Sequence, residues 1–454
     1  MIESTVHVVN LGCPKNLVDS EVMAALLAQA GCRIVSTPEE AEIVLLNTCA
    51  FILPAREESI DEIFRLAEWK RQGNCRHLIV TGCLPQRYGV ELAAEIPEVD
   101  LFLGISEVPN IADHLRKLRD GQLDAQANRA VVTPPLFLMN AGHPRLLSAP
   151  TFSAYLKIAE GCSHRCAYCV IPEIRGKARS RPVDDLLEEA QGLADRGIRE
   201  LILIAQDTTA YGRDLPGRPT LALLLRELAA LEGLAWIRLL YTYPSGLADE
   251  LFAVIAEHDR ICPYLDVPIQ HIDDAVLKAM KRQGDSRRIR KRLSRAREVI
   301  PGLALRTSLI VGFPGETPAQ FNRLLAFVQE IRFDHLGVFP YSPEEGTPAD
   351  KLPRQVSERT KKARRNLLME EQAVISNEIN STLVGSLQEV LIEGPSGHPD
   401  YPFVGRCRRQ APEIDGVTYV KGGNQALPPG SLVPCRIVAA DDYDLFAEPV
   451  GSPY

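Results

Sequence analysis

Three cysteines within eight residues place the strongest constraint on how this chain folds. The segment Cys162-Ser-His-Arg-Cys166-Ala-Tyr-Cys169 has to form a tight loop if its three thiolates bind one metal centre. Three thiolates can hold three irons of a cubane iron–sulfur cluster, which leaves the fourth iron open to a small molecule. A structural zinc site is the alternative, but zinc usually takes four ligands in C-x2-C or Cys/His pairs. His164 could supply one nitrogen, yet no second pair follows nearby, so the cluster is favoured.

The composition is that of a soluble protein with several domains. At 454 residues the chain is too long for one ordinary core, which suggests about three domains. Its hydrophobic content of 45% and charged content of 24% are typical of globular proteins. Apolar runs such as Leu201–Ala205 are strand-sized, and the N-terminus lacks the features of a signal peptide. We therefore expect a cytoplasmic protein without membrane contact, whose eleven cysteines favour metal binding over disulfides.

The charge distribution argues against a general nucleic-acid binder. The net charge is −8, whereas contacts with phosphates need a cationic surface. One segment, Lys281–Arg297, differs from the rest and contains nine Lys and Arg residues. Two interpretations of this segment stay open: a solvated helix face, or a local contact with RNA or an anionic substrate.

Residues 1–118 are predicted to form a parallel α/β domain. Short runs rich in β-branched residues, at Val6–Asn10, Ile43–Asn47 and His77–Thr81, alternate with helical patterns, which indicates a parallel sheet covered by helices. Each predicted strand is followed by a cysteine, and ligands gather where the strands of such sheets end. These residues are Cys13, Cys49 and Cys83. They form either a second three-cysteine set at one sheet edge or three buried structural thiols.

Three further parts follow along the chain. Residues 119–150, which include Gly121, Pro134 and Pro135, have weak periodicity and are typical of a linker. Residues 151–375 contain six strand candidates separated by helices, which predicts a partial (β/α)6 barrel with the Cys162 loop after its first strand. The candidates are Tyr155–Ala159, Glu200–Ala205, Trp236–Tyr241, Cys262–Val267, Ala304–Val311 and His335–Tyr341. Residues 376–454 alternate short apolar strands with Gly/Pro turns, which predicts a small all-β barrel.

The motifs and the order of these parts resemble a known class of enzymes. The C-x3-C-x2-C spacing, with Tyr168 before the last cysteine, resembles the signature of radical S-adenosylmethionine enzymes. Nearly the whole chain is similar to the methylthiotransferases of that class, whose three-cysteine domain, radical barrel and C-terminal TRAM-like β-barrel occur in this order. The resemblance implies an α/β protein with a small all-β domain and two [4Fe-4S] clusters. Their ligands would be Cys13, Cys49 and Cys83 for one cluster, and Cys162, Cys166 and Cys169 for the other.

Several stretches resemble the branch of this family that modifies a ribosomal protein. They are Leu11–Glu21, Tyr241–Pro244 and Asp266–Ile272, with Ser342–Thr347 similar more loosely. This similarity implies addition of a methylthio group to the β-carbon of an aspartate in small-subunit ribosomal protein twelve. Residues 376–454 agree, because their ten acidic and five basic residues suit a basic partner better than tRNA. The alternatives are a tRNA adenosine methylthiotransferase and a non-enzymatic iron–sulfur module that docks on ribosomes.

The resemblance also implies cofactors and further site residues. S-adenosylmethionine would be both radical source and methyl donor, and a one-electron reductant such as flavodoxin or ferredoxin would reduce the clusters. Contacts with S-adenosylmethionine are expected from Tyr168, Gln206, Asp207, Gly312 and Gly315.

Some of these residues have simpler structural interpretations. Tyr168 could instead pack within its own loop, and Gly312 and Gly315 could be ordinary turn glycines. Glu316 is expected to cap the helix that begins near Thr317. His271 is expected to be a structural histidine. The other cysteines fit no ligand set: Cys32, Cys75, Cys262, Cys407 and Cys435.

Overall fold

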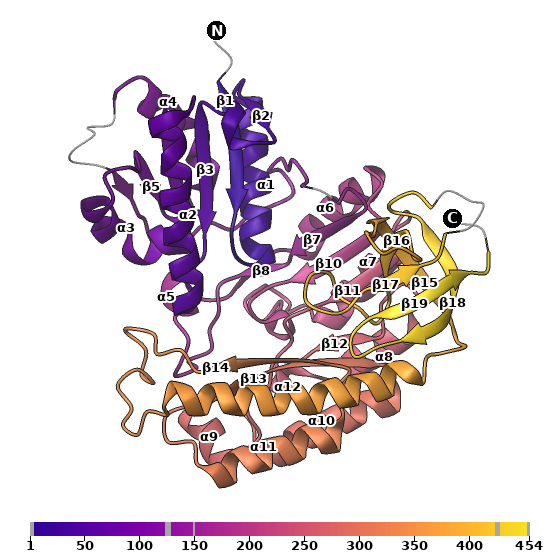
Figure 1. The fold of residues 1–454 in the computed structure, drawn as a ribbon. Helices are drawn as coiled ribbons and strands as arrows, with labels where there is room; N and C mark the ends of the chain where they lie inside the picture. Colours follow the sequence, from indigo (N-terminus) through magenta and orange to yellow (C-terminus); the bar gives the residue numbers. More distant parts are fainter. Residues whose placement is uncertain (1–3, 123–128, 149, 423–426, 452–454) are drawn as a thin grey trace. The chain divides into compact units, whose positions relative to one another are not determined.

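The computed structural model describes residues 4–122, 129–148, 150–422 and 427–451 (Figure 1). The chain divides into two compact units, each made from several separate segments. The first unit comprises residues 1–149, 157–186 and 342–350, and the second comprises residues 150–156, 187–341 and 351–454. The first unit therefore contains the N-terminal sheet together with the Cys162–Cys169 segment.

The first unit is built on a six-stranded sheet with the order β2-β1-β3-β4-β5-β6, in which all paired strands are parallel. The strands are β1 (Thr5–Asn10), β2 (Arg33–Val35), β3 (Ile43–Thr48), β4 (His77–Gly82), β5 (Leu101–Leu103) and β6 (Ala130–Val131). The helices between them are α1 (Pro14–Gln29), α2 (Leu53–Gln72), α3 (Cys83–Glu95) and α4 (Ile111–Arg119). The predicted parallel α/β domain is confirmed. Strand β6 lies in the segment expected to be a linker.

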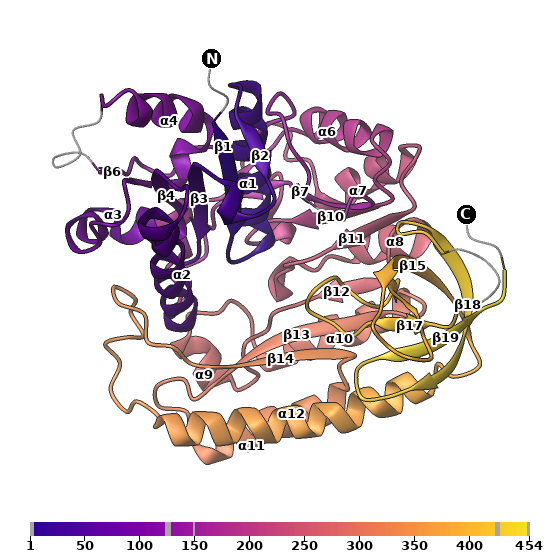
Figure 2. The same ribbon diagram turned by 45° about the horizontal axis from the view of Figure 1, so that its top comes forward.

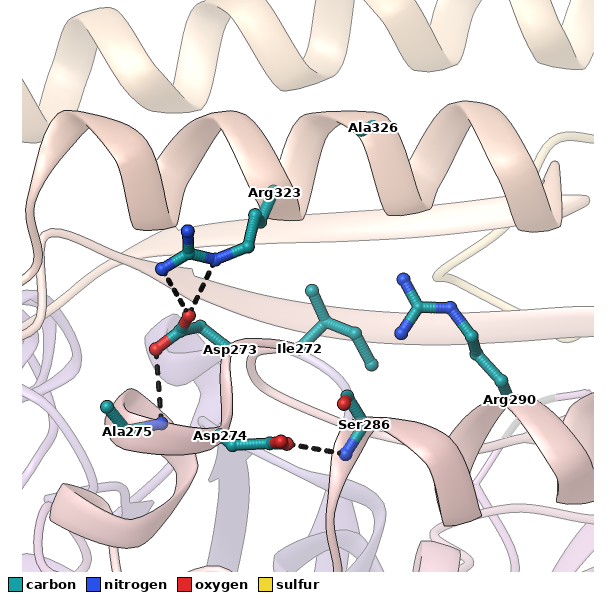
Figure 3. A pocket seen from close by; sticks show the side chains of 8 residues that line it. All are labelled: Ile272, Asp273, Asp274, Ala275, Ser286, Arg290, Arg323 and Ala326. Carbon is teal, nitrogen blue, oxygen red and sulfur yellow. Dashed lines mark hydrogen bonds and ion pairs between the residues drawn. The ribbon is translucent and has the colours of Figure 1, made fainter.

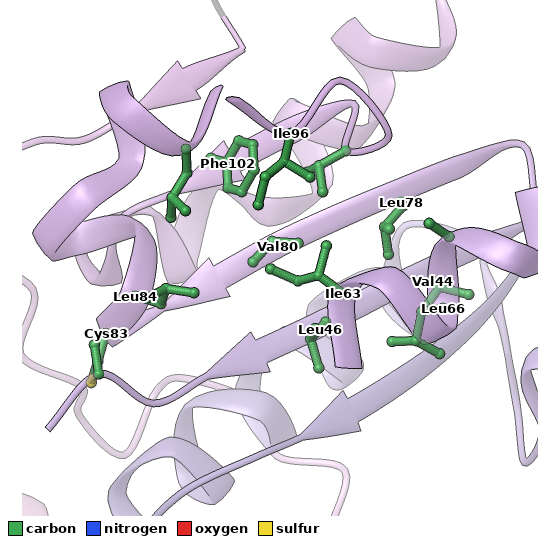
Figure 4. Packing of buried hydrophobic residues seen from close by; sticks show 14 of the residues in the cluster. Val44, Leu46, Ile63, Leu66, Leu78, Val80, Cys83, Leu84, Ile96 and Phe102 are labelled. Carbon is green, nitrogen blue, oxygen red and sulfur yellow. The ribbon is translucent and has the colours of Figure 1, made fainter. Parts of the chain in front are cut away.

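An apolar core packs against this sheet (Figure 4). Leu46 of β3 and Val80 of β4 contribute to it, and every residue of β3 is buried. Such complete burial is expected for a parallel strand covered on both faces. Val170 and Ile174, which follow Cys169, belong to the same core. The short helix α5 (Ile171–Arg175) is therefore anchored to the N-terminal sheet.

The second unit contains six strands arranged in their order along the chain. They form two three-stranded sheets, β7-β10-β11 and β12-β13-β14, and a parallel bridge joins Ile237 of β11 to Ile261 just before β12. The strands are β7 (Ser153–Lys157), β10 (Glu200–Ile204), β11 (Trp236–Leu239), β12 (Tyr264–Asp266), β13 (Ala304–Val311) and β14 (His335–Pro340). This arrangement confirms the predicted partial (β/α)6 barrel.

Helices separate these strands and cover the barrel. They are α6 (Val183–Asp195), α7 (Leu221–Ala230), α8 (Asp249–Glu257), α9 (Asp274–Ala279), α10 (Ser286–Val299), α11 (Pro318–Ile331) and α12 (Glu358–Ser381). Figures 1 and 2 show the long helix α12 running along β13 and β14. Within the described ranges, no helix combines the length and the apolar character needed to span a membrane.

The basic segment Lys281–Arg297 includes most of α10, and several of its arginines pair with carboxylates. Arg290 binds Glu330, and Arg292 binds Asp249. Both arginine side chains are partly exposed. Such pairing supports the solvated helix face, one of the two interpretations left open by the sequence.

The C-terminal residues form a closed barrel of five strands in the order β15-β16-β17-β19-β18. The strands are β15 (Leu387–Pro395), β16 (Phe403–Cys407), β17 (Thr418–Val420), β18 (Leu432–Ala440) and β19 (Leu445–Pro449). Arg406 of β16 binds the Glu200 carboxylate at the start of β10. The indole of Trp236, at the start of β11, donates to Glu389 of β15 at 2.6 Å. Within the second unit, this barrel therefore bonds to the N-terminal ends of the (β/α)6 strands.

Candidate functional site

Three cysteines of the first unit lie at the carboxyl ends of neighbouring parallel strands. Cys13 follows β1, Cys49 follows β3, and Cys83 is the first residue of α3 after β4. The side-chain oxygen of Asn16 accepts hydrogen bonds from the Cys13 thiol at 3.6 Å and from the Cys83 thiol at 3.8 Å. The side chain of Cys49 lies against Gly12, the residue before Cys13. The sheet thus brings together three thiols that are far apart in the sequence.

Asn16, at the centre of this set, is fully buried and firmly held. Its amide nitrogen donates to Asn47 Oδ1 at 3.2 Å and to the carbonyl oxygen of Thr48 at 2.8 Å. Asn47 in turn donates to the Asn16 carbonyl at 2.8 Å. These bonds fix which end of the Asn16 amide faces the thiols, because the nitrogen is committed to β3.

Burial disfavours the thiolate forms of Cys49 and Cys83 unless a positive charge lies nearby. Burial, with smaller effects from Cys83 and Cys13, raises the pKa of the Cys49 thiol to about 12. It also raises the pKa of the Cys83 thiol, an effect that the Arg175 guanidinium opposes. Metal ligation requires the thiolate form, and bound iron supplies the compensating positive charge. The donor set therefore fits an iron–sulfur cluster.

The second set, Cys162, Cys166 and Cys169, lies between β8 (Ala159–Glu160) and α5. Backbone hydrogen bonds close this loop: the Cys162 amide donates to the Gly176 carbonyl at 2.9 Å, and the Cys169 amide donates to the Cys166 carbonyl at 3.2 Å. All three cysteines are half-buried. A short loop with partly accessible thiols suits a cluster that keeps one iron open to a small molecule.

Glycines precede Cys83 and Cys162, and the backbone requires both. Gly82 has a φ of 100° and Gly161 a φ of 81°. A methyl group would lie 2.2 Å from Asn47 Oδ1 at position 82 and 2.3 Å from the Lys177 carbonyl oxygen at position 161. Only glycine can adopt these conformations without a clash. The Gly-Cys pairs are thus a sequence signal for the turns that position the thiols.

A site for a single metal ion requires a different arrangement of ligands from a site for a cubane cluster. In the part of the chain that the structure describes, no three His, Cys, Asp or Glu side chains converge on one metal ion. In a cubane cluster each thiolate binds a different iron, so its three sulfurs surround the cluster. The two cysteine sets therefore have to be judged as separated thiols around a cluster, and not as side chains that meet at one ion.

Four buried charged side chains connect the segments that carry the two sets. Asp19 of α1 and Glu160 of β8 each bind both Lys157 and Arg175, and all four side chains are at most 6% exposed. Two cations and two anions balance, which lets the network be buried without net charge. Sequence reasoning missed this network because no periodicity or motif relates residues so far apart.

A segment from much later in the chain, Ser342–Asp350, also belongs to the first unit. The amide of Ala349 donates to the carbonyl of Ala167, between Cys166 and Cys169, at 2.8 Å. The buried carboxylate of Glu344 accepts a hydrogen bond from the Leu53 amide at 2.9 Å. The segment therefore contacts both the second cysteine loop and the start of α2.

Comparison with known proteins assigns three regions. Residues 5–104 match the Uncharacterized protein family UPF0004, residues 156–328 the Radical SAM superfamily, and residues 384–450 the TRAM domain. Ribosomal protein uS12 methylthiotransferase RimO of Syntrophus aciditrophicus (strain SB) is 79% identical over 453 residues, which is 100% of both chains. The protein of the same name from Geobacter sulfurreducens is 52% identical, with 98% of both chains covered. The chain belongs to this RimO family.

Membership of the RimO family confirms the resemblance to radical SAM methylthiotransferases found in the cysteine motifs. A solved structure agrees at the level of the fold. TsrM of Kitasatospora setae, a radical S-adenosylmethionine methyltransferase with cobalamin and a [4Fe-4S] cluster bound, aligns with a TM-score of 0.56 and 16% identity. The alignment covers 86% of this chain and 81% of TsrM.

In this RimO-family chain, the other predicted site residues occupy loops at the carboxyl ends of barrel strands. Gln206 and Asp207 follow β10, and Gly312 and Gly315 follow β13. The Asp207 carboxylate accepts from the Thr209 amide at 2.9 Å and therefore also shapes its own turn. Such loops carry the active sites of barrel enzymes. Tyr168 lies in the first unit, half-buried between Cys166 and Cys169.

The prediction that Glu316 caps α11 was wrong. Thr317 is the N-cap of that helix and forms a capping box with Gln320. The Glu316 carboxylate instead turns back and accepts from the Gly312 amide at 2.6 Å and the Phe313 amide at 3.2 Å. It is also paired with Arg364 of α12 at 2.7 Å. Glu316 therefore rigidifies the glycine turn after β13.

That His271 is a structural histidine stays a prediction, because its buried Nε2 has no hydrogen-bond partner among the described residues and lies 4.0 Å from Glu316 Oε2. The His271 side chain is fully buried, and its Nδ1 accepts a hydrogen bond from the Asp273 amide at 2.9 Å. Burial lowers the pKa of His271 to about 4, so the imidazole is neutral near pH 7. A neutral, backbone-bonded ring is suited to shaping the loop after β12.

A pocket in the second unit lies near this histidine but contains no predicted site residue (Figure 3). Its charged groups already have partners: Arg323 binds Asp273, Arg290 binds Glu330, and the Asp274 carboxylate accepts from the Ser286 amide at 2.7 Å. These bonds leave the pocket without an evident ligand-binding group. The cysteine sets remain the candidate functional site.

Proposed function

We propose that this chain adds a methylthio group to the β-carbon of an aspartate in ribosomal protein uS12. The observation that carries this proposal is the presence of two three-cysteine sets in one compact unit of a RimO-family chain. An unactivated β C–H bond has no acidic proton, so carboxylates and histidines cannot activate it as general bases. Radical chemistry from bound cofactors is needed instead.

Each cysteine set is proposed to hold one [4Fe-4S] cluster. The ligands are Cys13, Cys49 and Cys83 for the first cluster, and Cys162, Cys166 and Cys169 for the second, which also binds S-adenosylmethionine. When bound, the clusters and S-adenosylmethionine supply the radical and sulfur-transfer chemistry. The residues of the chain hold the thiolates and leave one iron of each cluster without a protein ligand.

The remaining site assignments are part of the same proposal. Tyr168, Gln206, Asp207, Gly312 and Gly315 are the proposed contacts with S-adenosylmethionine. The proposed domains are 1–118 for the first cluster, a linker at 119–150, the radical core at 151–375 and the TRAM-like domain at 376–454. We propose a cytoplasmic protein that receives electrons from flavodoxin or ferredoxin.

Charge favours a protein substrate over tRNA. Residues 376–454 carry ten acidic residues against five Lys and Arg, which repels phosphates and attracts a basic protein. The arginines of α10, the basic segment that could have bound RNA, include Arg290 and Arg292, which are paired with carboxylates. Both features support uS12 as the substrate.

The test is anaerobic reconstitution of the full chain with iron, sulfide, S-adenosylmethionine and a reductant. We expect formation of 5′-deoxyadenosine and a methylthio mass increase on uS12. Mass spectrometry of uS12 and of tRNA nucleosides from a deletion strain then identifies the substrate in cells. Loss of methylthio groups from tRNA alone would contradict the proposed substrate. Absence of 5′-deoxyadenosine would favour a non-enzymatic iron–sulfur module.

A further inference from the structure

Arg175 joins the two cysteine-bearing segments and has no role in the function proposed above. It is the last residue of α5, shortly after Cys169, and its side chain is only 2% exposed. One terminal nitrogen donates to Asp19 at 3.0 Å and to Glu160 at 3.1 Å. The other donates to Asn16 Oδ1 at 2.7 Å and to the Cys83 sulfur at 3.5 Å.

These four partners fix the guanidinium plane. Asp19 and Glu160 hold one side of the group, which aims the second nitrogen at Asn16 and the sulfur. The planar guanidinium of arginine can donate to the carboxylates from one nitrogen and to Asn16 and the sulfur from the other, whereas the single ammonium of lysine cannot. Lys157 offers a comparison within the same network, because its ammonium binds Asp19 and Glu160.

We propose that Arg175 is a positioning residue that hydrogen-bonds the Cys83 sulfur and raises the reduction potential of the cluster held by Cys13, Cys49 and Cys83. Reduction adds negative charge to the cluster, and a buried cation with an N–H bond to a ligand sulfur stabilises that charge. Arg175 follows Cys169 on the same short segment. The bond therefore also ties the first cluster to the loop of the second.

The test uses the full chain with Cys162, Cys166 and Cys169 all replaced by alanine, so that only the first cluster is loaded. This parent protein and its Arg175→Met, Arg175→Lys and Lys157→Met variants are reconstituted anaerobically. Their reduction potentials are measured by titration followed with electron paramagnetic resonance. Iron content and circular dichroism establish that each variant is folded and loaded.

We expect Arg175→Met to shift the potential to more negative values, and Arg175→Lys to shift it less because the charge is retained. Lys157→Met, which removes a cation from the same two carboxylates, is expected to cause a smaller shift than Arg175→Met. If Arg175→Met binds no cluster, Arg175→Lys becomes the deciding variant. A reduction potential of Arg175→Lys equal to that of the parent protein then overturns the proposal. Equal shifts in Arg175→Met and Lys157→Met also overturn it, because they indicate a general charge effect.

This inference rests on the proposed cluster at Cys13, Cys49 and Cys83, and the same samples separate the two claims. A parent protein without iron refutes the cluster itself. A loaded parent whose potential does not respond to Arg175 refutes only the role of Arg175.

Discussion

The turn before Cys83 shows how much one residue determines at this site. Gly82 ends β4 with a φ of 100°, and its α-carbon faces the Asn47 side chain and the Thr48 backbone. The same Asn47 holds Asn16, whose oxygen contacts the Cys83 thiol. A side chain at position 82 would therefore displace both the turn and the amide that faces the thiols.

Gly82→Ala is expected to destabilise the protein by about 3–5 kcal/mol, because it combines backbone strain with a clash in a packed interior. Gly31→Ala is the matched control: Gly31 has a φ of 89°, but nothing lies within 4 Å of the added methyl group. It should cost only about 1–2 kcal/mol from strain. Denaturant unfolding gives both values. Similar losses in the two variants would show that the crowding at Gly82 is unimportant.

Cys49 separates the two proposed clusters experimentally. Cys49→Ala is expected to lose roughly half of the bound iron, because a cubane with two protein ligands is not retained at the first site. Cleavage of S-adenosylmethionine should survive, since it depends on the second set. Cys32→Ala, which removes a half-buried thiol outside both sets, is the control for iron content. Iron equal to that of the unmodified chain in Cys49→Ala would argue against the first cluster.

At the scale of elements, the sequence predicted strands better than helix ends. The run Ala304–Val311 coincides with β13, and Ile43–Asn47 differs from β3 by one residue. Such strands are predictable because runs of apolar and β-branched residues, or alternation of apolar with polar residues, mark them in the sequence. The helical pattern in the sequence after Cys13 starts at Val18, whereas α1 begins at Pro14, because Cys13 is the extended N-cap and proline suits the first turn.

Contacts between distant segments could not be predicted in the same way. The cysteine positions could be inferred because each ends a recognisable strand. Ser342–Asp350 is attached to α2 through the Ser342 hydroxyl and the buried carboxylate of Glu344, and nothing in the sequence distinguishes Glu344 from its neighbour Glu345.

Glu344 provides a test of how firmly this segment is held. Its carboxylate pairs with Arg87 at 2.9 Å and Arg56 at 3.3 Å, and it is 1% exposed. Glu344→Ala should cost about 3 kcal/mol, because it leaves partly buried arginines without their partner. The exposed neighbour gives the control: Glu345→Ala should change stability by less than about 0.5 kcal/mol. Limited proteolysis should cut Ser342–Asp350 faster in Glu344→Ala alone, and equal rates in both variants would contradict the anchor.

At the scale of the whole molecule, buried ionisable groups determine how stability depends on pH. In the second unit, Glu200 is paired with Arg406 and Arg238, and although burial opposes it, this pairing lowers its pKa to about 2. That stabilisation is complete above pH 4.5, the ordinary pKa of the group, and is lost as the pH falls towards 2. It links the C-terminal barrel to the (β/α)6 strands, so strong acid should weaken the attachment between them.

His271 governs a higher pH window. Its pKa falls from 6.5 to about 4 on folding, so the folded protein favours the neutral ring. The contribution of His271 to stability is therefore complete above pH 6.5 and is lost as the pH falls to about 4, a loss of about 3 kcal/mol. Burial raises the pKa of Glu316, which acts in the opposite direction near its ordinary value. The contribution of His271 therefore has to be isolated by substitution.

His271→Asn should flatten the dependence of unfolding free energy on pH between 6.5 and 4. The asparagine oxygen can still accept from the Asp273 amide, so the loop keeps its hydrogen bond while the titrating ring is removed. His258→Asn removes a half-buried imidazole of the same unit and is the matched histidine-to-asparagine control. Urea unfolding at a series of pH values measures each slope. An unchanged slope in His271→Asn would mean that other groups are responsible for the loss of stability between pH 6.5 and 4.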